Sequence, residues 1–158
     1  MIRKEYLFVL LTGLALIFPG CDSKRVYEKN IELANGSWNK DSVLIFQIEV
    51  KDTISEHNLL LNVRNYGSYK YSNLFLFVRA ISPKGSMIRD RIECTLAEKS
   101  GKWIGDGSGG LYHLQQLYKD SVRFPYPGIY TFEIQHGMRE DNLEDIADIG
   151  FRLEKIDE

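Results

Sequence analysis

The chain has 158 residues, of which 44% are hydrophobic and 27% charged, and its formal net charge is −2. A chain of this length can bury a sizeable core and is expected to form one main domain. The weak negative charge argues against a nucleic-acid partner, because proteins that bind nucleic acids carry a basic face. The composition therefore favours a globular domain that binds neither DNA nor RNA.

The residues up to Cys21 predict the compartment in which the protein works. Arg3 and Lys4 form a short positive head, and an apolar run follows at 6–18. This run is too short to span a bilayer, which requires roughly 20 residues, and is typical of a secretory signal. Cys21 stands directly after the Pro-Gly pair that closes the run, as in bacterial lipoprotein signals, in which this cysteine is acylated. An uncleaved helix with a chance cysteine is the alternative. We predict a signal peptide at 1–20 and a lipid on Cys21.

The rest of the chain predicts a tether and a β-domain. Segment 21–35 is polar after its cysteine and contains a first short strand at 26–33, and a turn signal separates it from the main domain at 36–158. With Cys21 acylated, Cys94 has no partner for an internal disulfide. A domain of this size can be stable without a disulfide.

Alternating hydrophobicity predicts most of the strands. Leu44, Phe46 and Ile48 share one face of a half-buried strand. The turn at 82–85 joins two apolar segments and predicts an antiparallel hairpin. The leucine spacing of segment 111–118 fits either a short helix or an irregular strand. The predicted strands are 26–33, 43–50, 59–64, 74–81, 87–96, an edge segment at 122–124, 129–135 and 149–153.

These patterns predict an all-β fold of about seven or eight short strands with little helix. Such spacing is typical of an antiparallel β-sandwich, either a jelly roll or an immunoglobulin-like fold. Segment 74–81 is apolar on both faces and should be a central strand. Ile88 and Cys94 fall on the inward face of strand 87–96, and Trp38 should close one end of the core.

The sequence contains no complete catalytic or metal-binding pattern. The glycine-rich segment 105–110 lacks the Gly-Lys-Ser/Thr of a phosphate-binding loop and the first glycine of a nucleophile elbow. Cys94 should be a small buried apolar group, and the three histidines lack metal-ligand spacing. We therefore expect no catalytic residue, no cofactor, no metal and no small-molecule substrate.

An acidic loop near the C-terminus allows one alternative. Its carboxylates could supply oxygen ligands to calcium, although their spacing is not that of an EF-hand, which also needs a glycine at its sixth position. We interpret the segment as a solvated acidic loop. The acidic residues are Glu140, Asp141, Glu144, Asp145 and Asp148.

Aromatic residues gather in or near the predicted loops. Exposed rings on a β-sandwich could stack on sugar rings or anchor a protein partner, and buried rings would instead pack over the ends of the sandwich. The sequence leaves both readings open. The residues are Tyr66, Tyr69, Tyr71, Trp103, Tyr112, Tyr118 and Tyr126.

Several short strings, in order and spacing, cover nearly the whole chain after the signal. They are Cys21–Glu28, Asn62–Asn65, Tyr71–Leu74, Leu96–Ala97, Gly101–Gly105, Phe124–Pro125, Gly128–Tyr130, Phe132–Ile134, Met138–Asp141 and Asp148–Gly150. On these strings the chain resembles the gliding motility lipoprotein GldH family of the Bacteroidota. The resemblance implies a cell-envelope lipoprotein that serves gliding motility and is linked to type IX secretion of surface adhesins. It implies no catalytic activity and no cofactor, and the functional residue it carries over is Cys21.

The hypothesis is therefore an interaction protein, anchored to a membrane by the lipid on Cys21, whose partners are other gliding or secretion proteins of the envelope. Arg64, Trp103, Arg139 and Glu140 lie in the densest matching strings and are the candidates for partner binding; arginine–carboxylate pairing that fixes long loops is their alternative role. A glycan-binding module of the envelope is the second hypothesis. We expect the domain to face the periplasm, with the inner and the outer membrane both open as sites of the anchor.

Overall fold

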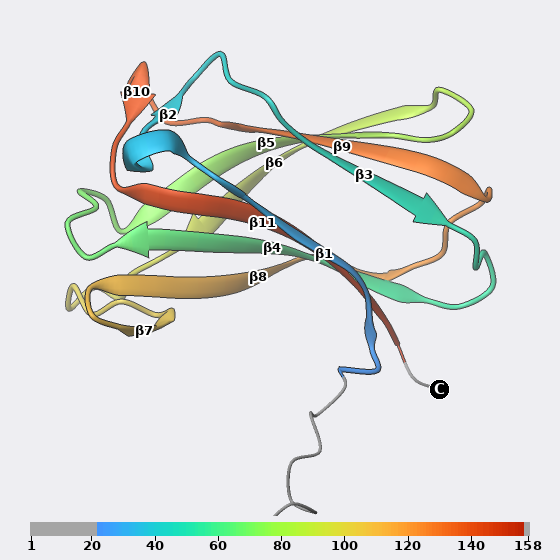
Figure 1. The fold of residues 1–158 in the computed structure, drawn as a ribbon, viewed down its shortest axis with the longest axis horizontal. Coiled ribbons are helices and arrows are strands. Elements are labelled where there is room, and N and C mark those ends of the chain that lie inside the picture. The colour runs from blue at the N-terminus through green and yellow to red at the C-terminus, as the bar shows by residue number, and fades with distance from the viewer. Residues whose placement is uncertain (1–21, 157–158) are drawn as a thin grey trace, which may run out of the picture.

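The computed structural model describes residues 22–156, and within them one short 3-10 turn, η1 (Ala34–Gly36), is the only helical element. Figure 1 shows the strands arranged in two layers. They are β1 (Arg25–Glu32), β2 (Trp38–Asn39), β3 (Leu44–Val50), β4 (His57–Tyr66), β5 (Asn73–Ile81), β6 (Met87–Thr95), β7 (Asp106–Ser108), β8 (Leu111–Val122), β9 (Gly128–His136), β10 (Asn142–Leu143) and β11 (Ile146–Lys155).

The strand order is that of a jelly roll. One sheet is ordered β1-β11-β4-β8-β7 and the other β3-β9-β5-β6, while β10 and β2 form a small ladder at one end (Figure 1). The first long strand pairs with the last, the second pairs with the last but one, and all these pairs are antiparallel. Among the eight long strands, every connection except that from β5 to β6 changes sheet. The predicted antiparallel β-sandwich is confirmed, and the order distinguishes the jelly roll from the immunoglobulin-like alternative.

Side-chain alternation fills the space between the two sheets. Every second residue of Leu44–Val50 is buried and the residues between them are exposed, as the pattern predicted. Phe132 of β9 stacks on Phe151 of β11, with 4.3 Å between ring centroids, and so joins the two sheets. Trp38 is fully buried and donates its Nε1–H to the carbonyl oxygen of Ser42 at 3.1 Å. The prediction that Trp38 closes one end of the core is confirmed.

The structure resolves the ambiguous segment and corrects two details. Segment 111–118 is the first part of the long strand β8, because residues 111–117 pair with β4, a partner that local spacing does not reveal. The predicted edge segment 122–124 is wrong, since Val122 ends β8 and Phe124 is buried in the connection to β9. Ile88 was expected to face inward but is 58% exposed, because it lies at the rim of a groove of about 350 Å³ between β6 and β8.

Other expectations are confirmed. The central position of 74–81 is that of β5, between β9 and β6, and Cys94 is fully buried without a disulfide. The strand expected at 26–33 is β1, which pairs with β11 along nearly its whole length. Within 22–156, no helix is long and apolar enough to cross a membrane. The predicted signal peptide 1–20 and the predicted lipid site Cys21 lie outside the described residues.

Candidate functional site

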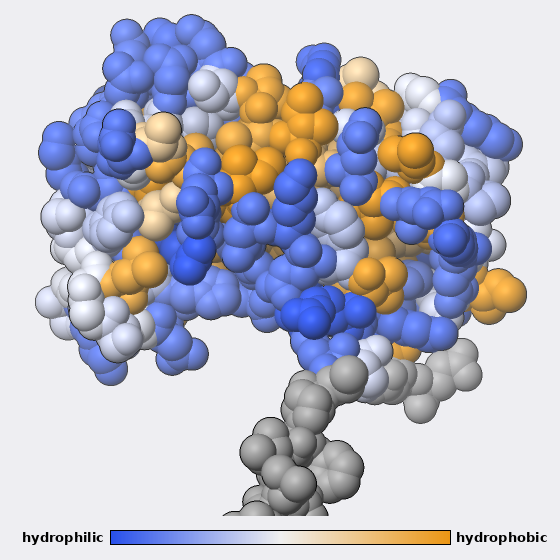
Figure 2. All heavy atoms as spheres, viewed as in Figure 1, coloured by the Kyte–Doolittle hydropathy of each residue, from blue (hydrophilic) through white to orange (hydrophobic). Residues whose placement is uncertain are grey.

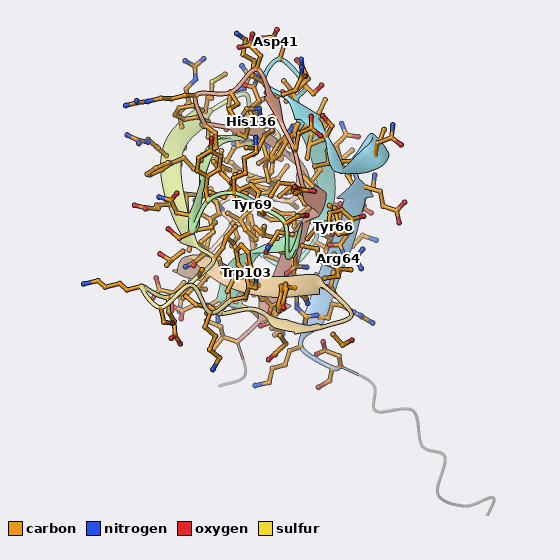
Figure 3. The ribbon with its side chains drawn as sticks, turned by 90° about the vertical axis from the view of Figure 1, so that its left-hand side faces the viewer. Asp41, Arg64, Tyr66, Tyr69, Trp103 and His136 are labelled. Carbon is orange, nitrogen blue, oxygen red and sulfur yellow. The ribbon has the colours of Figure 1, made fainter. Side chains whose placement is uncertain are left out.

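The loops at one end of the sandwich hold most of the candidate partner residues. These loops connect β4 to β5, β6 to β8 and β9 to β11, and Figure 3 views this end, with Tyr66, Tyr69 and Trp103 labelled. We call it the aromatic end and define it by five residues, each of which contacts the next in the order given. They are Tyr112, Trp103, Tyr69, Tyr71 and Glu140.

A row of aromatic rings crosses this end. The ring of Trp103 lies 5.6 Å from that of Tyr112 and 6.5 Å from that of Tyr69, and both pairs are tilted. Tyr69 in turn meets Tyr71 edge to face, with 5.7 Å between centroids. Tyr69 is buried and donates its hydroxyl to the carbonyl oxygen of Asn73 at 3.1 Å. The row therefore closes the end of the core and is held in one arrangement by ring contacts and a hydrogen bond.

Trp103 is placed by a local turn. The backbone N–H of Glu98 donates to the carbonyl oxygen of Lys102 at 2.8 Å, and Gly101 turns the chain with a φ of +86°. Trp103 then forms a β-bridge with Ala97. The side chain stays half-buried, because its far side borders a groove of about 630 Å³ lined by the turn and by the β7 segment. Trp103 thus seals the core and also reaches the surface.

Glu140 joins the row at its other end. The hydroxyl of Tyr71 donates to Glu140 Oε1 at 2.6 Å, and this hydrogen bond is the main cause of the raised pKa of Tyr71. Lys70 lies 4.0 Å from the same carboxylate. Two of the predicted partner residues, Trp103 and Glu140, are therefore connected through Tyr69 and Tyr71. Arg139, which directly precedes Glu140 in the chain, is exposed on the surface of this end.

Arg64 lies apart from this cluster. It sits on the outer face of the β1-β11-β4-β8-β7 sheet, and its Nε–H donates to Asp148 Oδ2 on the neighbouring strand β11. Asp148 is 1% exposed, while the Arg64 side chain is 35% exposed. Burial raises the pKa of the Asp148 carboxyl, and the guanidinium of Arg64 opposes this shift. Arg64 thus forms an arginine–carboxylate pair, but this pair joins two neighbouring strands and not the long loops of the alternative role.

The pair belongs to a polar layer on the outer face of that sheet. Arg152 bridges the carboxylates of Glu28, at 2.8 Å, and of Glu154. The fully buried Asn62 donates to Glu28 at 2.9 Å and accepts a hydrogen bond from Gln115 at 3.0 Å. Figure 2 shows hydrophilic residues gathered over the middle of this face. Such cross-strand contacts fix the strand register and leave few of these groups free to bind a partner.

Carboxylates of the predicted acidic segment interact with different residues of the domain. Asp141 pairs with Lys40 at 2.7 Å, and Glu144 accepts a hydrogen bond from the hydroxyl of Ser37, also at 2.7 Å. Asp148 is held by Arg64, as described above. Within 22–156, no group of three or more His, Cys, Asp or Glu side chains is arranged to hold a metal ion. The carboxylates therefore tie the loop to the body of the domain.

Cys94 and His136 are two buried titratable groups. Cys94 is fully buried, and burial raises the pKa of its thiol to about 12, so the thiolate is absent at neutral pH. His136 is buried against the edge of Trp38, with 5.4 Å between ring centroids, and burial lowers its pKa. The two groups serve the core, in which a neutral ring and a thiol behave as apolar volume.

One contact across the open side of the sandwich was missed from the sequence. The hydroxyl of Tyr118 on β8 donates to Asp90 Oδ2 on β6 at 2.6 Å, and Lys119 lies 2.9 Å from the same carboxylate. The hydrogen bond from Tyr118 is the main cause of the lowered pKa of Asp90. No sequence signal marks this contact, because the two strands belong to different sheets and do not pair.

Three comparisons place the chain among known proteins. The model of the GldH lipoprotein family matches residues 25–153. A gliding motility lipoprotein GldH homolog of Christiangramia forsetii is 36% identical over 162 residues, which cover 98% of this chain and 99% of that protein. The gliding motility lipoprotein GldH of Flavobacterium johnsoniae is 34% identical over 156 residues, which cover 94% of this chain and 96% of that protein. Among solved structures, a family GH115 4-O-methyl-α-glucuronidase aligns with a TM-score of 0.44 at 11% identity, over 86% of this chain and 18% of that one.

Proposed function

The chain belongs to the GldH lipoprotein family, and from this premise we propose that it is a lipid-anchored, non-enzymatic accessory of gliding motility. The resemblance drawn from the sequence strings is thereby confirmed. The proposal adds what the family name leaves open: a lipid on Cys21, a domain that faces the periplasm, and service to the type IX secretion machinery through protein–protein contact. Residues 1–20 are the cleaved signal in this account, and the sandwich is the part that partners contact.

The aromatic end is the observation that carries the proposal. It lies at the opposite end of the sandwich from the start of β1 (Figure 1), where the chain leaves toward Cys21. The ten residues of β4 run between the two ends, which corresponds to roughly 30 Å at the rise of a β-strand. A lipid on Cys21 would hold one end at the membrane and leave the aromatic end accessible to a partner.

The chemistry of this end suits a protein partner. Trp103 is half-buried and rigidly placed, which is typical of an aromatic anchor at the centre of an interface. Arg139 offers an exposed guanidinium in the β9–β11 loop of the same end, where Asp141 pairs with Lys40 and Glu144 accepts a hydrogen bond from Ser37. An aromatic anchor and charges of both signs at one end of a domain are how specific protein interfaces combine affinity with orientation.

A protein partner is favoured over the glycan-binding alternative. A sugar ring stacks on an aromatic face that is open to solvent. Tyr69 is buried, Trp103 and Tyr112 are half-buried, and their rings are tilted by 34° to each other, so they do not form one flat platform. The non-enzymatic part of the proposal is supported by Cys94, whose buried thiol has no role in nucleophilic chemistry.

The proposal is tested by complementation of a strain that lacks its own copy of this protein. Cys21→Ser should move the protein from the membrane to the soluble fraction and abolish colony spreading. Arg139→Glu should keep membrane localisation and protein level but reduce spreading and single-cell movement several-fold. Trp103→Ala should reduce both as well, and its protein level is measured alongside because Trp103 also seals the core. Arg89→Glu is the matched control, because it makes the same charge change at an exposed position on β6. Wild-type spreading by both aromatic-end variants, at normal protein level, would contradict the proposed interface.

A further inference from the structure

The chain is fixed to the sandwich immediately after position 21. Asp22 forms an ion pair with Arg152 near the end of β11. The N–H of Lys155 donates to the carbonyl oxygen of Lys24 at 2.8 Å, and β1 begins at Arg25. On the proposed function, Cys21 carries the lipid, so no flexible linker separates the lipid from the domain. Because one residue spans at most about 3.6 Å, this end of the sandwich must lie against the membrane surface.

The turn between β3 and β4 lies beside this attachment point. Lys155 Nζ approaches Asp52 Oδ2 at 3.4 Å, and the N–H of Ile156 donates to the carbonyl oxygen of Glu56 at 2.9 Å. The residues that bind the start of the chain therefore also bind the turn at 51–56. A groove of about 190 Å³ separates the turn from the start of β1 and is lined by both.

The turn is rigid and presents an aliphatic side chain at its tip. Asp52 Oδ1 accepts hydrogen bonds from the N–H groups of Ile54 at 2.9 Å and Ser55 at 3.0 Å, and the hydroxyl of Ser55 donates to Oδ2 at 2.6 Å. The bond from that hydroxyl is the main cause that holds the pKa of Asp52 well below its usual range. Ile54 is 82% exposed, more than any other exposed large hydrophobic residue within 22–156.

The charges around the tip are paired and partly exposed. Lys51 is exposed and lies 3.6 Å from the exposed Glu49, and Lys155 is half-exposed and lies 3.4 Å from Asp52. The two carboxylates of the turn are engaged, Asp52 by the turn itself and Glu56 by Arg123 at 3.0 Å. Lysines with long apolar stems reach headgroup phosphates while an adjacent aliphatic side chain enters the acyl boundary.

We infer that the 51–56 turn is a membrane contact, in which Ile54 inserts into the headgroup–acyl boundary beside the acylated Cys21. The inference rests on the proposed lipidation. Transfer of an exposed isoleucine from water into this boundary lowers the free energy of the system. With the lipid and the turn both in contact, the domain has two points of attachment and stands in one orientation. The aromatic end then points away from the bilayer by the length of the sandwich.

The experiment uses the full lipoprotein, purified from membranes and reconstituted into phosphatidylethanolamine–phosphatidylglycerol vesicles. Ile54→Cys introduces the one thiol open to an environment-sensitive fluorophore, because Cys94 is buried and Cys21 is acylated in this account. Ile104→Cys is the matched control, since Ile104 is an exposed isoleucine (46%) beside Trp103. We expect blue-shifted emission and quenching of at least about twofold by nitroxide lipids at position 54, and neither at position 104.

Two outcomes would overturn the inference, and they are distinguishable. If the vesicle-bound protein shows the same water-like emission and the same lack of quenching at both positions, the turn does not touch the bilayer, and the proposed anchor stands. If the wild-type protein fails to float with the vesicles, the lipid itself is absent, and the proposed function fails together with the inference.

Discussion

Asp148 is the residue whose environment is most demanding. Its carboxylate is 1% exposed, it accepts a hydrogen bond from Arg64, and its Oδ1 has no hydrogen-bond partner within 22–156. Burial favours the neutral form, and Arg64 favours the charged form. A buried carboxylate that depends on a single guanidinium makes that arginine more important for folding than a surface position would suggest.

Replacement of Arg64 is therefore predicted to act on stability. Arg64→Met removes the positive partner and should lower the free energy of unfolding at pH 7 by about 2 to 3 kcal/mol, less than for a fully buried pair because Arg64 is 35% exposed. Urea denaturation monitored by tryptophan fluorescence measures this change. Arg64→Met combined with Asp148→Leu should recover part of the loss. A single substitution that costs less than about 0.5 kcal/mol would mean that the pair does not stabilise the fold.

The burial of His136 leads us to expect that the stability of the fold depends on pH. Burial lowers the pKa of His136 in the folded protein, whereas the pKa in the unfolded chain is about 6.5. Near and below pH 6.5 the unfolded chain therefore binds a proton at this residue more readily than the folded protein does. The free energy of unfolding should fall as the pH is lowered from about 7.5 to 5.5. Melting temperatures of the wild type and of His136→Gln across this range test the point. The variant should show a smaller slope, and equal slopes would assign the effect to other groups.

At the scale of elements, the glycine-rich β7–β8 hairpin supports Trp103. A Cβ on Gly107 would lie 2.4 Å from the carbonyl oxygen of Leu111, and one on Gly105 would lie 2.7 Å from the backbone of His113. Gly109 and Gly110 follow with positive φ angles at the turn. The glycine-rich pattern of 105–110 indicates a loop with tight turns, and only Gly109 and Gly110 form such a turn. Asp106–Ser108 is instead strand β7, which approaches the backbone of β8 too closely for a side chain at Gly107.

Substitution in this hairpin is predicted to be costly. Gly107→Ala must displace backbone and should lower the free energy of unfolding by about 2 kcal/mol or more. Gly85→Ala is the control, because a Cβ there meets nothing within 4 Å and only the positive φ of +82° is unfavourable, at a cost of about 1 kcal/mol. Chemical denaturation compares the two. A loss for Gly107→Ala no larger than that for Gly85→Ala would contradict the close approach.

The sequence predicts the elements whose pattern is local. The alternation from Leu44 to Val50 is sufficient to assign β3, since one face of that strand is buried and the other is solvated. It is insufficient for β8, whose partner β4 lies far away in sequence and whose pairing with it contains irregular register shifts. The two-residue strands β2 and β10 are too short to carry any period.

In the candidate site too, the sequence predicts individual residues but not contacts between distant segments. Trp103 and Glu140 were chosen from the sequence, but their connection through Tyr69 and Tyr71 depends on three loops that meet only in the folded chain. Arg64 is separated from this group because its side chain lies on the outer face of the β1-β11-β4-β8-β7 sheet. Adjacent residues of a strand face opposite sides of a sheet, and a single sequence does not show which side faces outward. A single sequence cannot show which loops converge at one end of a jelly roll.

At the scale of the whole molecule, the jelly roll separates two tasks along its long axis (Figure 1). One end binds the start of the chain through Arg152 and carries the 51–56 turn. The other end carries the aromatic row and the acidic loop. Connections that cross between two sheets brace both ends, so on the proposed function the domain would act as a rigid spacer between a membrane and a partner.

The most direct test of this account is site-specific photocross-linking in living cells with the lipoprotein expressed at its natural level. A photoreactive amino acid replaces Arg139 at the aromatic end, and in a second strain replaces Arg89 on β6. The account predicts a covalent adduct with an envelope protein of the gliding or type IX secretion machinery from position 139, identified by mass spectrometry, and none from position 89. Adducts from position 89 alone, or no protein adduct from position 139, would contradict it.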